Sequence, residues 1–198
     1  MPADSALQTD RLILRRWRAS DRAPFAHLNH DSRVMEFFPS PLSPEESAHF
    51  IDRIEAHFDH HGFGLWAAEL RSTREFIGYI GLAVPRFESA FTPCVEIGWR
   101  IAFAYWGRGL ATEGARAAVR FAFEDLALQE LVSFTVPANL RSRRVMEKLG
   151  MARNPAEDFD HPLLPIGHSL RAHVLYRLVN PSTRATEDHN HAEDGLPC

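Results

Sequence analysis

The sequence has 198 residues, of which 45% are hydrophobic and 24% are charged. This size and composition predict one globular domain around one core, and they exclude a disordered chain and a membrane-embedded one. The formal net charge of -4 gives no general attraction to polyanions, so we expect no nucleic-acid partner. Two cysteines are too few for a disulfide framework, and neither a membrane-length apolar run nor a signal-peptide pattern occurs, so we predict a cytoplasmic protein without membrane contact.

The first part of the chain predicts a strand followed by two helices. The run 12–17 is typical of a strand, and a helix is expected from Ser20 to His30. A second helix begins after Ser43, which is an N-cap residue, with Pro44 and two glutamates in its first turn. Its apolar residues recur at helical spacing up to the turn at 61–64: Phe50, Ile51, Ile54 and Phe58.

A change of hydrophobic period predicts an antiparallel meander in the middle of the chain. Residues 65–70, 76–82 and 95–99 are short β-type runs separated by turn-like clusters. The most amphipathic helix of the chain follows, and its apolar stripe must pack against a sheet. The stripe is formed by Ala115, Ala118, Val119, Ala122, Phe123 and Leu126.

The strand expected at 131–136 comes directly after that helix. The order strand, helix, strand predicts a parallel pair joined by a right-handed crossover. Asn139 then begins a short helix that ends before Gly150, and further strands are expected near Met151 and at 173–178. The polar, aperiodic residues 180–198 predict a disordered tail.

The segment from Tyr105 to Thr112 lies between a strand and the amphipathic helix. Gly107, Gly109 and Ala111 would let successive backbone N–H groups approach an anion, and the helix start adds the positive end of its dipole. The pattern indicates a pyrophosphate cradle, and an ordinary glycine turn is the alternative. The Gly-Lys-Ser/Thr ending of a P-loop is missing, and the strand 131–136 ends without the acid of a dinucleotide site.

These residues resemble the GNAT N-acetyltransferases, within the RimJ/RimL-like branch of ribosomal-protein N-terminal acetyltransferases. The family pattern Gln/Arg-x-x-Gly-x-Gly/Ala reads Trp106-x-x-Gly109-x-Ala111 here, with Trp in the leading position. The resemblance spans residues 9–178 and also rests on the segments 9–15, 95–99, 137–139 and 145–150.

The resemblance implies an α/β (α+β) fold, the acyl-CoA N-acyltransferase fold. Its central sheet is mixed and largely antiparallel, with splayed middle strands, and helices flank it. We expect this domain over residues 9–179, after a lead of residues 1–8.

The resemblance also implies acetyl-CoA as cosubstrate, with no metal. Its pantetheine arm would pair with backbone in the gap between the splayed strands, and its pyrophosphate would lie on the glycine loop. The expected coenzyme-binding residues are Ile101, Ala102, Phe103, Trp106, Gly107, Arg108, Gly109, Leu110, Ala111, Thr112, Asn139 and Arg144.

Acetyl transfer to an amine requires a base, because acceptor amines are protonated near neutral pH. Glu96 is our candidate, because it lies on the splayed strand with its side chain on the face opposite its apolar neighbours; an exposed or ion-paired strand glutamate is the alternative. Ser142 matches the family position beside the thiol and is our candidate proton donor to the leaving thiolate. Asn139 can hold the pantetheine, cap the helix, or do both.

Other polar clusters are weaker signals. His57, His60 and His61 share a helix face, but no second cluster with zinc-type spacing accompanies them, so we predict no metal site. The run 141–144 and Arg108 supply arginines for coenzyme phosphates or for solvent. The segment 158–162 can shape an acceptor pocket or form an ordinary polar turn.

We therefore predict an acetyl-CoA-dependent N-acetyltransferase acting on a primary amine. The acceptor classes are a protein N-terminus, a polyamine, an amino acid or an aminoglycoside, and a homodimer is left open. Two other hypotheses compete: a non-catalytic acyl-CoA-binding module that regulates a partner, and a nucleotide-binding domain of Rossmann type.

Overall fold

The computed structural model describes residues 6–182. Residues 1–5 of the predicted lead and residues 183–198 of the predicted tail lie outside the described residues. Residues 180–182 of that tail are described: Asn180 is buried and its amide donates to the Gln129 carbonyl at 2.8 Å, so the folded part of the chain extends past the predicted start of the tail. Leu7 and Gln8, the end of that lead, form a short strand of the sheet. Within residues 6–182, no helix is long and apolar enough to cross a membrane.

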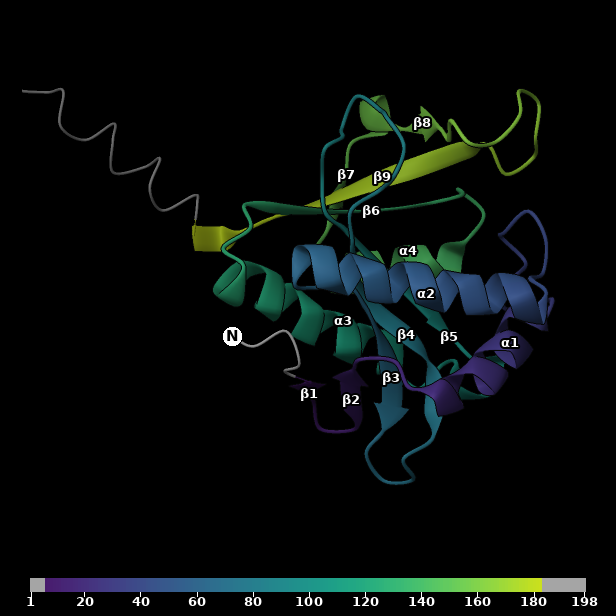
Figure 1. The fold of residues 1–198 in the computed structure, drawn as a ribbon. Helices are drawn as coiled ribbons and strands as arrows, with labels where there is room; N and C mark the ends of the chain where they lie inside the picture. Colours follow the sequence, from purple (N-terminus) through teal and green to yellow (C-terminus); the bar gives the residue numbers. More distant parts are fainter. Residues whose placement is uncertain (1–5, 183–198) are drawn as a thin grey trace, which may run out of the picture.

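The described chain forms one sheet flanked by helices, as the sequence predicted (Figure 1). The strands are β1 (Leu7–Gln8), β2 (Leu12–Arg15), β3 (Leu65–Leu70), β4 (Phe76–Ala83), β5 (Glu96–Ile101), β6 (Glu130–Thr135), β7 (Ala152–Arg153), β8 (Phe159–Asp160) and β9 (Ala172–Val179). The helices are α1 (Arg22–His30), α2 (Pro44–His61), α3 (Leu110–Arg120) and α4 (Leu140–Lys148). Short helical turns are η1 (Ala19–Asp21), η2 (Phe103–Tyr105), η3 (Phe121–Asp125) and η4 (Pro155–Glu157).

The sheet order is β1-β2-β3-β4-β5-β6-β9-β7, with β8 also paired to β9. Neighbouring strands of the described chain are antiparallel except β5 and β6, which are parallel and in register only at Glu96 and Val132. By contrast, β5 pairs with β4 along its whole length, and β6 does the same with β9. The meander, the parallel pair and the splay between β5 and β6 are therefore confirmed.

Local sequence explains both ends of α2. The Ser43 hydroxyl accepts a hydrogen bond from the Glu46 amide at 3.1 Å, and the Glu46 carboxylate accepts one from the Ser43 amide at 2.7 Å. This capping box satisfies two amide groups that a helix start leaves without partners, and Pro44 needs none. At the other end Gly62 adopts a left-handed φ of 75°, which a residue with a Cβ rarely adopts.

The amphipathic helix is shorter than its apolar pattern predicted. α3 ends at Arg120, and the chain continues through the π-helical turn η3, where the Leu126 amide donates to the Phe121 carbonyl at 3.1 Å. The apolar pattern continues because Ala122 of this turn is still fully buried. Periodicity reports which face is buried, and it does not distinguish a π turn from an α turn.

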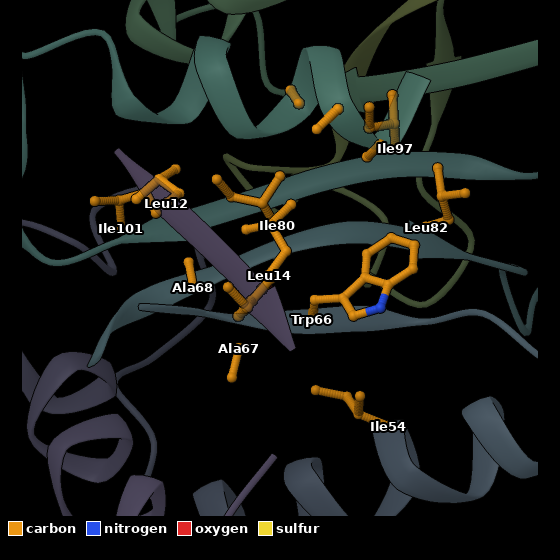
Figure 2. Packing of buried hydrophobic residues seen from close by; sticks show 14 of the residues in the cluster. Leu12, Leu14, Ile54, Trp66, Ala67, Ala68, Ile80, Leu82, Ile97 and Ile101 are labelled. Carbon is orange, nitrogen blue, oxygen red and sulfur yellow. The ribbon is translucent and has the colours of Figure 1, made fainter. Parts of the chain in front are cut away.

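Helices cover both faces of the sheet, and successive strand residues pack in opposite directions (Figure 2). α3 packs on β4 and β5, whereas α1 packs on α2 and contacts β4. On β4, Ile80 lies against α3. Its neighbour Tyr79 packs on the other face against Phe25 of α1, and the two ring centroids are 6.1 Å apart. This alternation places Tyr79 and its cross-strand partner Arg100 on the α1 side of the sheet.

A buried ion cluster joins β2, η1 and β3. The Arg15 guanidinium is 2.7 Å from Asp21 and 2.7 Å from Glu69, and Glu69 is fully buried. Each of these charges therefore has an opposite charge within hydrogen-bonding distance. Such pairing offsets the free energy that is lost when a charge leaves water.

A matched pair of glycines tests how closely β3 and β4 pack. Gly81 and Gly98 are cross-strand partners, and a Cβ at Gly81 would lie 2.2 Å from the Gly64 carbonyl oxygen, whereas at Gly98 its nearest neighbour would be a Glu96 oxygen at 3.8 Å. We expect Gly81→Ala to lower the free energy of unfolding by about 1–3 kcal/mol through overpacking. Gly98→Ala should stay within about 0.5 kcal/mol of the parent in urea titrations. Equal unfolding midpoints for the two variants would contradict this packing.

Candidate active site

A cavity of about 730 Å³ lies where β5 and β6 diverge. β5 lines it from Glu96 to Ile101 without Ile97, and β6 lines it from Ser133 to Thr135. The loop before α3, the first turns of α4 and the segment after α1 complete its walls. The cavity thus lies over the splay, where the facing edges of two strands no longer pair with each other.

The loop 105–109 and the first turn of α3 form one side of the cavity. Gly107 and Gly109 both have left-handed φ values, 74° and 77°, which glycine tolerates best. Gly109 is the N-cap of α3, so the first amide groups of the helix point toward this side without partners inside the helix. A helix start with this geometry is suited to bind an anion, and the anion site itself stays a prediction.

A network from the N-terminal segment holds the start of α3. Glu113 accepts hydrogen bonds from the Thr9 hydroxyl at 2.5 Å, the Arg11 amide at 2.8 Å and the Arg11 side chain at 2.6 Å. Burial would raise the pKa of Glu113, but these hydrogen bonds outweigh it and lower the pKa. Arg11 also donates to the Arg108 carbonyl at 3.0 Å. The sequence analysis did not identify this network, because its members are about a hundred positions apart.

The tryptophan in the leading position of the motif supports the loop. The Trp106 indole N–H donates to the Ile101 carbonyl at 2.7 Å. The indole ring packs beside Phe103, with 5.1 Å between the ring centroids. The Ala102 amide donates to the Ile77 carbonyl at 2.8 Å, so part of the backbone expected to meet the pantetheine is already bonded within the protein. A carbonyl oxygen retains a second lone pair, so Ile101 can still accept from a ligand.

Glu96 lies at the vertex of the splay, on the face of β5 opposite the buried Ile97. Its carboxylate lines the cavity, so it is partly accessible there although protein surrounds it. Burial raises the pKa of Glu96 to about 8. No ion pair satisfies this carboxylate within residues 6–182, so the ion-paired alternative does not describe it. A carboxyl group with a pKa near 8 is suited to exchange a proton at neutral pH.

The start of α4 brings Asn139 and Ser142 to the cavity. The Asn139 side chain accepts from the Ser142 amide at 3.2 Å and donates to the Thr135 hydroxyl at 3.0 Å. Asn139 is thus an N-cap, one of its two expected roles, and its amide retains a second N–H for a ligand. The half-buried Ser142 lines the cavity.

The four arginines considered for phosphate contacts have different surroundings. Arg144 lines the cavity, as does Arg141, which pairs with Glu36 and lies 4.5 Å above the Trp106 ring. Arg143 instead donates to the Pro137 carbonyl at 3.0 Å, and the exposed Arg108 lies over Tyr105. Arg141 and Arg144 are therefore the ones at the cavity.

The segment 158–162 contributes one polar residue, His161, to the cavity. His161 lines it beside His173, at 5.1 Å between ring centroids, and burial lowers the pKa of both. Asp158 pairs with Arg153, and Asp160 pairs with Arg171 at 3.1 Å, so these acids are neutralised outside the cavity.

His57 of α2 has a structural role. His57 Nδ1 lies 2.8 Å from the Phe63 carbonyl, and its Nε2 accepts from the Val84 amide at 3.0 Å. Both ring nitrogens are therefore occupied by backbone groups, in the neutral tautomer with the proton on Nδ1. Within residues 6–182, no group of three or more His, Cys, Asp or Glu is arranged to hold a metal ion.

Several cavity residues were missed by the sequence analysis, most importantly Arg100 and Tyr79 of neighbouring strands. A signal was available for Arg100: it follows Glu96 and Gly98 at a spacing of two, and alternate residues of a strand share a face.

Comparison with known proteins places the chain among acetyltransferases. The model of the Acetyltransferase (GNAT) domain matches residues 11–152. The uncharacterized N-acetyltransferase YnaD of Bacillus subtilis is 28% identical over 174 residues, which cover 87% of this chain and 96% of YnaD.

Solved structures have the same fold. A GNAT-family acetyltransferase from Bacillus anthracis gives a TM-score of 0.73 at 23% identity, covering 89% of this chain and 99% of that one. Ribosomal-protein-S5-alanine acetyltransferase from Vibrio fischeri gives a TM-score of 0.71 at 16% identity, with coverage of 90% and 98%. These neighbours confirm the predicted fold, and the second has the activity of the branch that the motif residues resembled.

Substitution of Gly109 tests the cradle. Gly109→Val should abolish binding of coenzyme A, because a β-branched residue is strained at a φ of 77° and blocks close approach of an anion to the backbone. Gly62→Val is the matched control, since Gly62 has a φ of 75° at the far end of α2. We expect calorimetry to give parental coenzyme A affinity for the control only. Parental coenzyme A affinity in Gly109→Val would show that the pyrophosphate does not bind at this loop.

Proposed function

The chain belongs to the GNAT acetyltransferase family, and on that premise we propose that it transfers the acetyl group of acetyl-CoA to a primary amine by direct attack on the thioester. It is an N-acetyltransferase; the donor, the acceptor and the roles of individual residues are our proposal. The observation that carries the proposal is the position of Glu96, a carboxyl group of raised pKa at the vertex of a splay that opens onto an anion-binding helix start.

The residues present fit acetyl-CoA. The amide groups of residues 107–112 would hold its pyrophosphate at the start of α3, with Arg144 nearby. The amide-bearing pantetheine arm would lie between β5 and β6, where strand groups lack a partner strand. Asn139 at the start of α4 would contact this arm, and Trp106 would hold the loop in place from the Ile101 side.

The chemical step requires three functions from the protein. Glu96 removes a proton from the ammonium group, directly or through one water, and the freed nitrogen forms a bond to the thioester carbon. A backbone N–H of β5 stabilises the oxyanion that develops. The carbon–sulfur bond then breaks, and Ser142 supplies a proton to the departing thiolate while it takes up the proton that the nitrogen loses on becoming an amide. No step needs a metal or a covalent enzyme intermediate.

Turnover across an amine panel tests the function itself. Release of coenzyme A, followed with a thiol reagent, should rise above the rate of hydrolysis with at least one class of amine: peptide N-termini, polyamines, amino acids or aminoglycosides. Tight coenzyme A binding without turnover on any class would instead favour a non-catalytic binding module.

Replacement of Glu96 tests the base. Glu96→Gln should lower the turnover number by roughly two to four orders of magnitude with little change in acetyl-CoA affinity. A base acts only when ionised, so the parental kcat/KM, which reports the free enzyme, should rise with pH until about 8, the pKa of Glu96 without acceptor. The variant should follow only deprotonation of the amine, and so recover toward high pH.

Glu88→Gln is a control for loss of a carboxylate, because Glu88 is exposed and is not among the residues that line the cavity. If Glu96→Gln lost the same fraction of activity at every pH and bound acetyl-CoA weakly, Glu96 would organise the strand, and His161 would become the candidate base.

Replacement of Ser142 tests the proton donor. Ser142→Ala should lower the turnover number roughly tenfold to a hundredfold at unchanged coenzyme affinity. Ser133→Ala is the comparison, since Ser133 is a second serine that lines the cavity. A parental rate for Ser142→Ala at saturating amine would remove Ser142 from the mechanism, and a selective loss in Ser133→Ala would assign the role to that hydroxyl.

A further inference from the structure

Arg100 is a buried charge that lines the cavity, with a side chain that is only 7% exposed. Its guanidinium donates to the Asn29 side chain of α1 at 2.6 Å and lies 4.1 Å from the ring centroid of Phe38. Tyr79, its cross-strand partner, lies beside it. Arginine has five N–H donors, and Nε has no acceptor. The protein therefore satisfies only part of this group.

No carboxylate neutralises Arg100 within residues 6–182, since none lies within the 4.0 Å of an ion pair. Arg15, the other arginine buried to this degree, touches two carboxylates. Burial lowers the pKa of Arg100, which reflects the cost of keeping its charge away from water. A buried charge without a counterion is costly, and a ligand that supplies the counterion recovers that cost.

Arg100, Gly98 and Glu96 follow one another on one face of β5, because alternate strand residues point the same way. Glu96 is the one carboxylate among the described residues that line the cavity. Gly98 lies between the two charged groups, and a Cβ there would approach only a Glu96 oxygen, at 3.8 Å. The floor of the cavity is therefore open between the candidate base and the guanidinium.

We propose that the acceptor amine carries a carboxylate, which binds Arg100 while the amine lies at Glu96 and the connecting chain crosses Gly98. This inference rests on the proposed function and names the substrate class of the same site. Glu96 and Arg100 are four strand steps apart, which is about 13 Å along the backbone, and a hydrogen bond at each end takes up about 3 Å. Several methylene groups must therefore separate the amine from the carboxylate, as in an ω-amino acid, whereas an α-amino acid is too short.

The wild-type enzyme tests this with a matched pair of acceptors. Acetyl-CoA turnover is measured with 6-aminohexanoate and with 6-aminohexanamide, which has nearly the same shape without the negative charge. We expect kcat/KM to be roughly 10- to 100-fold higher for the carboxylate, the size of a hydrogen-bonded charge contact. Alanine, an α-amino acid, should be a poor acceptor. Equal values for the matched pair, or a preference for the amide, would overturn the proposal.

Variants of Arg100 separate recognition from structural support. Arg100→Met should remove the preference for 6-aminohexanoate mainly through KM, and it should leave coenzyme A affinity and the rate with the amide near parental values. Arg100→Lys should retain part of the preference, because the charge remains. An equal loss with both acceptors in Arg100→Met would assign Arg100 a structural role alone.

A binding measurement keeps the test independent of catalysis and of whether Arg100→Met folds. Hexanoate, which has the carboxylate but no amine, should bind the wild-type protein in the presence of coenzyme A, and Arg100→Lys should bind it more weakly. Hexanoate binding without turnover of any amine would contradict the proposed acetyl transfer and support the carboxylate site. Turnover of uncharged amines with no hexanoate binding would contradict the carboxylate site alone.

Discussion

The divergence of β5 from β6 is the constraint on which the rest of the site depends. Because the two strands are in register only at Glu96 and Val132, the edge of β5 beyond that point has no strand beside it, and a cavity opens. Unpaired strand edges are costly unless something bonds to them. In our proposal the same gap receives an amide-bearing arm, and Glu96 lies at its vertex. Because the glycine loop and α3 connect β5 to β6, the helix start that we propose as the anion site lies beside the gap.

Buried ionisable groups are paired in the scaffold and unpaired in the cavity. Arg15, Asp21 and Glu69 are buried together with each carboxylate against the Arg15 guanidinium, which locks β2, η1 and β3. Glu69 also pairs with Arg18 and Arg74, so its charge is compensated. In the cavity, Glu96 and Arg100 share one strand face, and neither has an ion-pair partner within the described chain. Burial consequently raises the pKa of Glu96 and lowers the pKa of Arg100. Unpaired buried charges destabilise a fold, so their presence together marks the part of the protein that is complete only with a ligand.

The sequence predicted those features that depend on neighbouring residues. The cap at Ser43, the glycine loop before the amphipathic helix and the antiparallel meander follow from local chemistry and period, and the structure has all of them. Features that depend on distant residues were not predictable. The Arg11 bonds to Glu113, and the enclosure of Arg100 by Asn29 and Phe38, require the packing of α1 and β2. The roles of individual site residues remain predictions, because position alone does not establish chemistry.

The buried, unpaired Glu96 and Arg100 couple acceptor binding to proton transfer. With a pKa of about 8, Glu96 is largely protonated at neutral pH before the acceptor arrives. An ammonium group beside it favours the ionised carboxylate, so the pKa of Glu96 falls as the acceptor binds. The two groups then titrate as a pair, and the apparent pKa values belong to the pair. A carboxylate on the acceptor that meets Arg100 would hold the ammonium at Glu96 without adding net charge to the cavity. A zwitterion is thus the acceptor that satisfies both buried groups at once.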